Sequence, residues 1–206
     1  MIGKDQMAKI LVTYATSNGS TAEVARAIGE ELQKSNQHVE VLPLESAGEL
    51  DSYDAVVVGA PMIMGWHRQA VRFIRKNRKA LKRLPLAAFV TCMSLTKTGE
   101  TQIEGVPVYV DENLPVLPQR AEALKFKERY ARISNYLRPI LKACPVKPVS
   151  IGIFGGRLDY GHMQWWAMIF VILILQAKAG DRRNWPGIRA WATSLAALFN
   201  ATTNER

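Results

Sequence analysis

Cysteine is scarce in this 206-residue sequence, which contains only Cys92 and Cys144. Two isolated thiols provide neither a disulfide framework nor the spacing of a metal-ligand cluster, so we expect no metal site and a reduced, cytoplasmic setting. The first nine residues lack the basic and then apolar segment of a secretion signal, which agrees with that setting. Internal repeats and long linkers are also lacking, so residues 1–206 are expected to form a single domain.

Acidic residues are outnumbered, because 18 Asp and Glu face 27 Lys and Arg and leave a formal net charge of +9. This excess predicts an anionic partner, namely a negatively charged small molecule, a membrane surface or a nucleic acid. Eight of the cations fall within residues 68–83, the segment of a predicted helix. No set of aromatic side chains for stacking on bases is interleaved with them, so nucleic acid is not expected as a partner. A solvated helix face is the alternative interpretation of this segment.

Apolar runs long enough to cross a bilayer, which takes about 20 residues, are absent from the sequence. The run at residues 165–175 has eleven residues, and its only polar side-chain groups are the indole N–H groups of Trp165 and Trp166. A helix that is apolar all round must be covered by something. Three explanations stay open: a central helix of the domain, a homodimer interface, or a segment that dips into an anionic membrane surface.

The membrane explanation gains from the residues that flank this run. The two tryptophans stand at one end, and beyond the other end lie Lys178, Arg182, Arg183 and Trp185. Tryptophan favours the membrane interface, and cationic side chains attract anionic headgroups. This hypothesis places the protein peripherally on the inner face of the cell membrane.

The best-defined motif is a strand–loop–helix junction near the start of the chain. Residues 9–14 form a short apolar run rich in β-branched side chains, and a helical pattern extends to Leu32. Ser20 and Glu23 have the spacing of a capping box, so the helix is expected to begin there. Such a junction directs unpaired backbone N–H groups and the positive end of the helix dipole at one point.

The loop of this junction has the composition of a phosphate-binding site. Its members are Thr16, Ser17, Asn18, Gly19, Ser20 and Thr21, several of which carry donor hydroxyls. The spaced glycines of a dinucleotide fingerprint and the Gly-Lys-Ser/Thr of a Walker loop are both missing. A phosphate monoester held by hydroxyls and amides without a lysine suits a mononucleotide such as FMN. An ordinary polar turn with a helix cap is the alternative.

This loop resembles the phosphate loop of the flavodoxins, Thr/Ser-x-Thr-Gly-x-Thr. Asn18 stands at the third position, where that motif has the threonine that precedes the glycine. The resemblance continues through the apolar run at residues 55–60 and a further strand near Phe89. Alternating strands and helices predict an α/β fold, and the resemblance implies a flavodoxin-like, doubly wound, five-stranded parallel sheet of order 2-1-3-4-5. Ligands of such sheets bind at the carboxyl edge where the strand order reverses, a rule for which flavodoxin itself is a known example.

The expected strands cover residues 9–14, 38–42, 55–60, 86–91 and 149–154, and the expected helices cover residues 20–32, 68–83, 121–143 and 187–199. Two additions distinguish the chain from a minimal fold of this type. Thr96–Arg120 is an insert after strand 4, too long for an ordinary connection, and is predicted to be a lid or rim over the flavin. The run at residues 165–175 adds an apolar helix after strand 5.

Two further loops are expected to meet the phosphate loop at the carboxyl edge. One consists of Pro61, Met62, Ile63, Met64, Gly65 and Trp66, with Trp66 as the predicted stacking partner of the isoalloxazine ring and Gly65 as the place of close backbone approach. The other consists of Thr91, Cys92, Met93, Ser94 and Leu95, whose amides are expected at the pyrimidine end of the ring. Burial of Met62, Met64 and Trp66 in a packing cluster is the alternative, and Cys92 is expected to be a small packing residue.

The overall layout and the segment Phe154-Gly155-Gly156-Arg157-Leu158-Asp159-Tyr160 resemble the flavodoxin-like protoporphyrinogen dehydrogenases. This resemblance implies an FMN-dependent oxidoreductase that passes electrons from protoporphyrinogen IX or a similar anionic donor to a quinone. The alternative is a flavodoxin-type carrier that serves a redox protein partner. No catalytic residue is assigned, because the cofactor performs the electron transfer; His67 and His162 are candidates for moving protons.

Overall fold

The computed structural model describes residues 7–17, 19–62, 65–96, 101–117, 128–129, 131–158 and 180–204. Its strands are β1 (Lys9–Tyr14), β2 (His38–Pro43), β3 (Ala55–Pro61), β4 (Leu86–Cys92), β5 (Leu95–Thr96), β6 (Gln102–Ile103), β7 (Val106–Val110), β8 (Val116–Leu117), β9 (Ser150–Gly155), β10 (Arg157–Leu158) and β11 (Gly180–Asp181). Its helices are α1 (Ser20–Lys34), α2 (Arg68–Lys76), α3 (Arg78–Leu81), α5 (Ile133–Ala143) and α7 (Trp185–Asn204).

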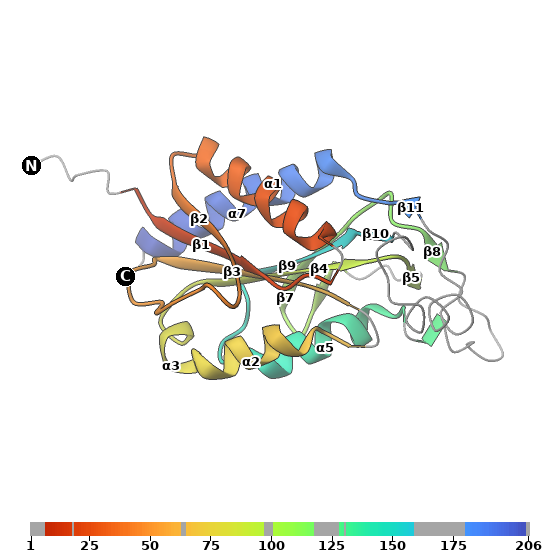
Figure 1. Ribbon diagram of the computed structural model, residues 1–206, viewed down its shortest axis with the longest axis horizontal. Coiled ribbons are helices and arrows are strands. Elements are labelled where there is room, and N and C mark those ends of the chain that lie inside the picture. The colour runs from red at the N-terminus through yellow and green to blue at the C-terminus, as the bar shows by residue number, and fades with distance from the viewer. Residues whose placement is uncertain are drawn as a thin grey trace, which may run out of the picture.

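A seven-stranded sheet of order β2-β1-β3-β4-β9-β7-β6 forms the centre of the molecule (Figure 1). Its first five strands pair in parallel, and their order is the predicted 2-1-3-4-5. Strands β3, β4 and β9 are buried along nearly their whole length because helices cover both faces of the sheet. The flavodoxin-like α/β fold expected from the sequence is confirmed.

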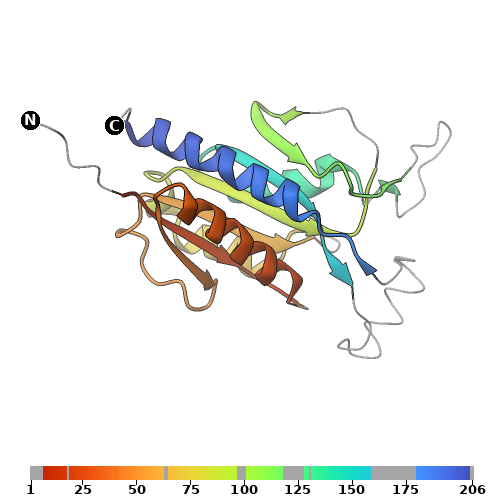
Figure 2. The same ribbon diagram turned by 90° about the horizontal axis from the view of Figure 1, so that it is seen from above.

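The helices lie in two layers, with α1 and α7 on one face of the sheet and α2, α3 and α5 on the other (Figures 1 and 2). Each layer closes its own apolar core against the sheet. On the side of α1 and α7, Phe154 packs edge-on against Trp191, whose indole Nε1 donates to Ser150 Oγ at 2.9 Å. Gly59 leaves room for the Phe89 ring, because a Cβ on Gly59 would lie 1.9 Å from that ring.

The insert after β4 extends the sheet. Strand β7 pairs in parallel with β9, and β6 pairs antiparallel with β7. The exposed Pro107 precedes the stretch of β7 that is paired with β9, so its missing N–H costs no hydrogen bond to that strand. The lid prediction is therefore wrong for residues 102–110, and it stays a prediction for the rest of Thr96–Arg120, part of which lies outside the described residues.

Two predicted helices differ in the structure. The helix expected over residues 68–83 is broken at Asn77, whose side-chain Nδ2 donates to Phe73 O at 3.0 Å. Phe73 O also accepts the helical bond from Asn77 N, but the backbone of Asn77 leaves helical geometry at φ −96° and ψ 17°, so α2 and α3 are separate. The helix expected over residues 121–143 is not continuous, because α5 begins at Ile133 and residues 131–132 are not helical.

The apolar run at residues 165–175 and His162 lie outside the described residues, so the three explanations of that run stay predictions. Among the helices that the structure describes, none is both long and apolar enough to span a bilayer.

Candidate cofactor-binding site

The carboxyl ends of β1, β3, β4 and β9 lie at one edge of the sheet, where backbone hydrogen bonds tie the following loops together. The three predicted loops meet there as expected, and the segment that follows β9 joins them. The bonds run from Ala15 N to Gly59 O at 2.9 Å, from Met62 N to Thr91 O at 3.0 Å and from Gly156 N to Cys92 O at 2.8 Å.

The phosphate loop ends in an uncapped helix N-terminus. Helix α1 begins at Ser20 as predicted, but its N-cap is Gly19, which has a positive φ of 79° and no side chain to cap with. The capping box predicted for Ser20 and Glu23 is therefore wrong. The amides of the first turn have no intrahelical acceptor, and among the described residues no side-chain cap is found for them. Thr16 and Ser17 are exposed beside this turn, while Asn18 lies outside the described residues.

Thr21 has a different role from the one predicted for it. Thr21 is 1% exposed, and its hydroxyl lies 2.9 Å from the hydroxyl of Thr91, which is also buried. This bond joins the first turn of α1 to the end of β4. Thr21 thus holds two of the predicted loops together and does not offer a free hydroxyl to the loop.

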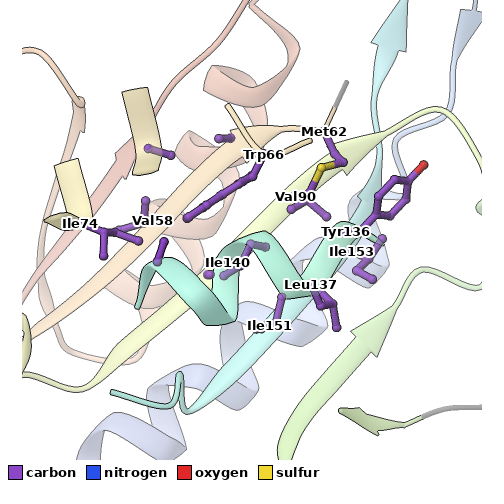
Figure 3. Close-up of a cluster of buried hydrophobic side chains, with 14 of the residues drawn as sticks. Val58, Met62, Trp66, Ile74, Val90, Tyr136, Leu137, Ile140, Ile151 and Ile153 are labelled. Atoms are coloured by element: carbon purple, nitrogen blue, oxygen red, sulfur yellow. The ribbon is translucent and has the colours of Figure 1, made fainter. Parts of the chain in front are cut away.

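The second loop turns its large side chains inward. Met62 and Trp66 pair as an isolated antiparallel bridge, and both lie in the core between the sheet and α5 (Figure 3). Trp66 is 5% exposed, which does not fit the predicted stacking on a flavin ring and agrees with the alternative of a packing cluster. Its indole Nε1 is buried without a hydrogen-bond partner among the described atoms. Ile63 and Met64 lie outside the described residues.

The close backbone approach predicted at Gly65 stays a prediction that its conformation allows. The φ of Gly65 is 127°, a conformation that a side chain rarely adopts, and no described atom lies within 4 Å of the position that a Cβ would occupy. The backbone at Gly65 is therefore open to a close approach by a flat ring.

The third loop is held on both of its sides. The Tyr136 hydroxyl of α5 donates to Ser94 O at 2.8 Å, and Arg182 Nη1 donates to Met93 O at 3.0 Å. The amide of Leu95 donates to Pro115 O at 2.9 Å. It is therefore not free to bind the pyrimidine end of a flavin, and the prediction is wrong for this amide. The Cys92 thiol is buried near Phe154 O, and burial raises its pKa from 9.0 to about 12. Cys92 is thus a packing residue, as expected.

A group of ion pairs lies at the same edge of the sheet, and the sequence did not predict that its members pair. Glu23, in the first turn of α1, accepts from both Arg157 and Arg183. Arg183 also binds Asp181 and lies over the Trp185 ring at 4.6 Å, and its side chain is only 5% exposed. These carboxylates hold the pKa of Arg183 above its usual range, with the hydrogen bond to Asp181 as the largest cause. The pairs fasten the segment before α7 to the phosphate loop.

Asp111, at the end of β7, fastens the insert to the same edge. It is 2% exposed, and its carboxylate accepts from Asn113 N at 3.0 Å, from Asn184 Nδ2 at 2.9 Å and from Gly155 N at 3.4 Å. Three segments that are distant in the sequence therefore share one buried carboxylate. An isolated aspartate in an irregular insert gave no sequence signal for this role.

His67 caps a helix next to the Gly65 loop, and a role for it or His162 in moving protons stays a prediction. His67 is the N-cap of α2 and accepts from Gln69 N through Nδ1 at 3.4 Å, and burial lowers its pKa. Among the described residues no group of His, Cys, Asp and Glu could hold a metal ion.

A family model described as "Flavodoxin domain" matches residues 11–184 of this chain. The chain belongs to the flavodoxin family. It is 22% identical over 206 residues to the protein named "Protoporphyrinogen IX dehydrogenase [quinone]" from Escherichia coli (strain K12), a match that covers 95% of this chain and 98% of that protein. A Leishmania major protein of the same name is 21% identical over 205 residues, covering 94% of this chain and 77% of its own.

The flavodiiron protein from Giardia intestinalis superposes with a TM-score of 0.51 at 11% identity, over 96% of this chain and 37% of that one. At this identity the likeness shows the fold alone. Family membership implies an FMN cofactor, as the phosphate loop predicted.

The described residues fit FMN at its two ends. A phosphate needs donors and positive potential, which the uncapped N-terminus of α1 and the exposed hydroxyls of Thr16 and Ser17 provide. A flat ring needs open backbone, which Gly65 provides. No described atom lies within 4 Å of where a Cβ on Gly19 would point, so the phosphate end is open as well.

Proposed function

We propose that this protein is an FMN-dependent oxidoreductase that takes electrons from protoporphyrinogen IX, or a similar anionic donor, and passes them to a quinone. The observation that carries the proposal is the nearly full-length match to proteins named protoporphyrinogen IX dehydrogenase [quinone]. The match includes the insert after β4 and the long segment before α7, so it is not limited to the phosphate loop. The net charge of +9 also favours an anionic donor.

In this proposal the chain binds and orients, and bound FMN supplies the electron transfer between donor and acceptor. Thr16, Ser17 and the first-turn amides of α1 hold the phosphate, and Gly65 admits the ring. Two cations flank the site edge and suit the carboxylates of the donor. Arg157, whose side chain is 39% exposed and pairs with Glu23 on one side, lies two residues after β9. The exposed Arg68 begins α2 two residues after Trp66, the last residue of the Gly65 loop.

The alternative function is that of an electron carrier for a redox protein partner. The family fold favours it to the same degree, because FMN at the edge of such a sheet serves either use. What separates the two is whether the isolated protein oxidises a small molecule by itself.

The test is anaerobic mixing of the FMN-loaded protein with protoporphyrinogen IX, followed by a soluble menaquinone analogue. The proposal predicts bleaching of the flavin absorption by the donor, its recovery with the quinone, and continued turnover when both are present. Arg157→Gln should raise KM for the donor without changing bleaching by dithionite, whereas Arg189→Gln, an exposed cation one turn into α7, should leave KM unchanged. A flavin that bleaches only with a reduced redox protein would contradict the proposal and support the carrier function.

A further inference from the structure

The positive charge of the chain is concentrated on one helix layer. We call this surface the basic layer; it consists of α2, α3, residues 82–83 and α5, and it contains no Asp or Glu. The rest of the chain holds 17 Lys and Arg against 18 Asp and Glu, so the net charge of +9 originates here. Its ten cations, all exposed, are Arg68, Arg72, Arg75, Lys76, Arg78, Lys79, Lys82, Arg83, Arg138 and Lys142.

Few carboxylates compensate the basic layer. Arg83 pairs with Asp51 at 3.0 Å, and the neighbouring Glu45 accepts instead from the neutral Gln69. Within the part of the chain that the structure describes, no ion pair joins the other nine cations to a carboxylate. The opposite layer is balanced, because Glu23, Glu30 and Glu31 of α1 stand against Arg26, Lys34 and Arg189 of α1 and α7.

The composition of the basic layer identifies the kind of partner. A specific protein interface has an apolar centre depleted in lysine, but the large exposed apolar residues that the structure describes, Met7, Val116 and Leu198, all lie elsewhere. Helices α2 and α5 pack side by side on one face of the sheet (Figure 1), and all of their cations are exposed. An apolar hollow borders the basic layer beside α2, lined by Leu44, Ala47 and Phe73 among polar residues. A broad set of flexible cations around so small an apolar area suits a surface of many mobile negative charges, as anionic lipid headgroups provide.

We propose that the basic layer adsorbs side-on to an anionic lipid surface. Arg68 begins α2 three residues after Gly65, so adsorption brings the edge of the flavin site beside the headgroups. This surface differs from the one expected from sequence, because Arg182 binds Met93 O and Arg183 is enclosed by Glu23, Asp181 and Trp185. Those two cations are engaged within the protein. The proposal does not depend on which molecule donates electrons.

The test compares vesicle binding by two triple variants that lower the net charge equally. The first carries Lys76→Gln, Lys79→Gln and Lys82→Gln on the basic layer, and the control carries Arg26→Gln, Lys34→Gln and Arg189→Gln on the opposite layer. Each protein is sedimented at low salt with vesicles of equal parts phosphatidylglycerol and phosphatidylcholine, and with phosphatidylcholine alone. All six positions lie on exposed helix surface or the turn after α3, and matching thermal melts confirm that both variants fold.

The wild type should pellet with the anionic vesicles only, and less so at high salt. Each cation near such a surface contributes roughly a fivefold factor, so the basic-layer variant should bind roughly 100-fold more weakly while the control changes little. Equal losses in both variants would overturn the proposal, because net charge alone would then explain binding. The proposal would also be overturned if the wild type stayed in the supernatant and bound short duplex DNA. A third contrary result would be vesicle binding that is abolished by Ile169→Lys with Leu173→Lys and kept by the basic-layer variant.

Discussion

Replacing Asp111 should weaken the fold more than any other single change in the insert. Its buried carboxylate accepts from three N–H groups, at 3.0, 2.9 and 3.4 Å. A buried donor left without an acceptor costs roughly 1–3 kcal/mol, and less where water can reach it. Since only the Gly155 amide is fully buried, Asp111→Ala should lower the free energy of unfolding by about 2–4 kcal/mol.

Urea denaturation measures this loss directly, and Tm should fall by roughly 4–16 °C for a chain of this size. Asp111→Asn keeps the shape but presents a donor to one of the three N–H groups, so it should lose about 1–3 kcal/mol and bind FMN more weakly under conditions in which it remains folded. Glu112→Ala removes an exposed neighbouring carboxylate and serves as the control. If Asp111→Ala lost no more stability than Glu112→Ala, Asp111 would not fasten the insert to the site.

Three further predictions follow from contacts at the site. Thr16→Ala removes a hydroxyl donor to a charged phosphate and should weaken FMN binding roughly 10- to 100-fold in a fluorescence titration. Thr21→Val should instead chiefly lower Tm, because the Thr91 hydroxyl loses its buried hydrogen-bond partner. Gly155→Ala places a Cβ 1.8 Å from Arg182 O and should lower Tm by several degrees, while Gly156→Ala, whose Cβ meets nothing closer than 3.6 Å, should not. Burial raises the pKa of Cys92 and Cys144 from 9.0 to about 12, so the native state keeps protons that the unfolded state loses. Stability should therefore fall as pH rises from about 9 to 12, and a Cys92→Ala variant with the same slope would refute this assignment.

The sequence predicted the parts of the fold that are encoded locally. The apolar runs of β3 and β4 are buried on both faces, and the ends of β1, β3 and β4 placed the three loops correctly. The sequence pattern suggested that Glu23 caps its own helix, but Glu23 pairs with Arg183 instead. Local patterns could not show this, because Arg183 is 160 residues away. Nor could they show the direction of Trp66, because an indole suits an apolar core as well as a flavin ring.

The insert was misjudged for a related reason. The stretch Val106–Val110 has a strand-like pattern, but Gly105 and Pro107 obscured it, and its partner β9 lies more than 40 residues later in the sequence. The pairing of an edge strand depends on which neighbour remains open, and this is known only once the sheet has been assembled. The same holds for Asp111, whose partners lie on three separate segments.

Titration of the apoprotein with FMN and, in parallel, with riboflavin tests the central claim most directly. The two ligands share the ring and differ by the phosphate, which is the group that the uncapped N-terminus of α1 and the exposed Thr16 and Ser17 are placed to hold. The account predicts one FMN bound per chain and riboflavin binding at least tenfold weaker, since charge-assisted bonds contribute roughly 1.5–3 kcal/mol each. Equal binding of both ligands, or binding of neither, would contradict it.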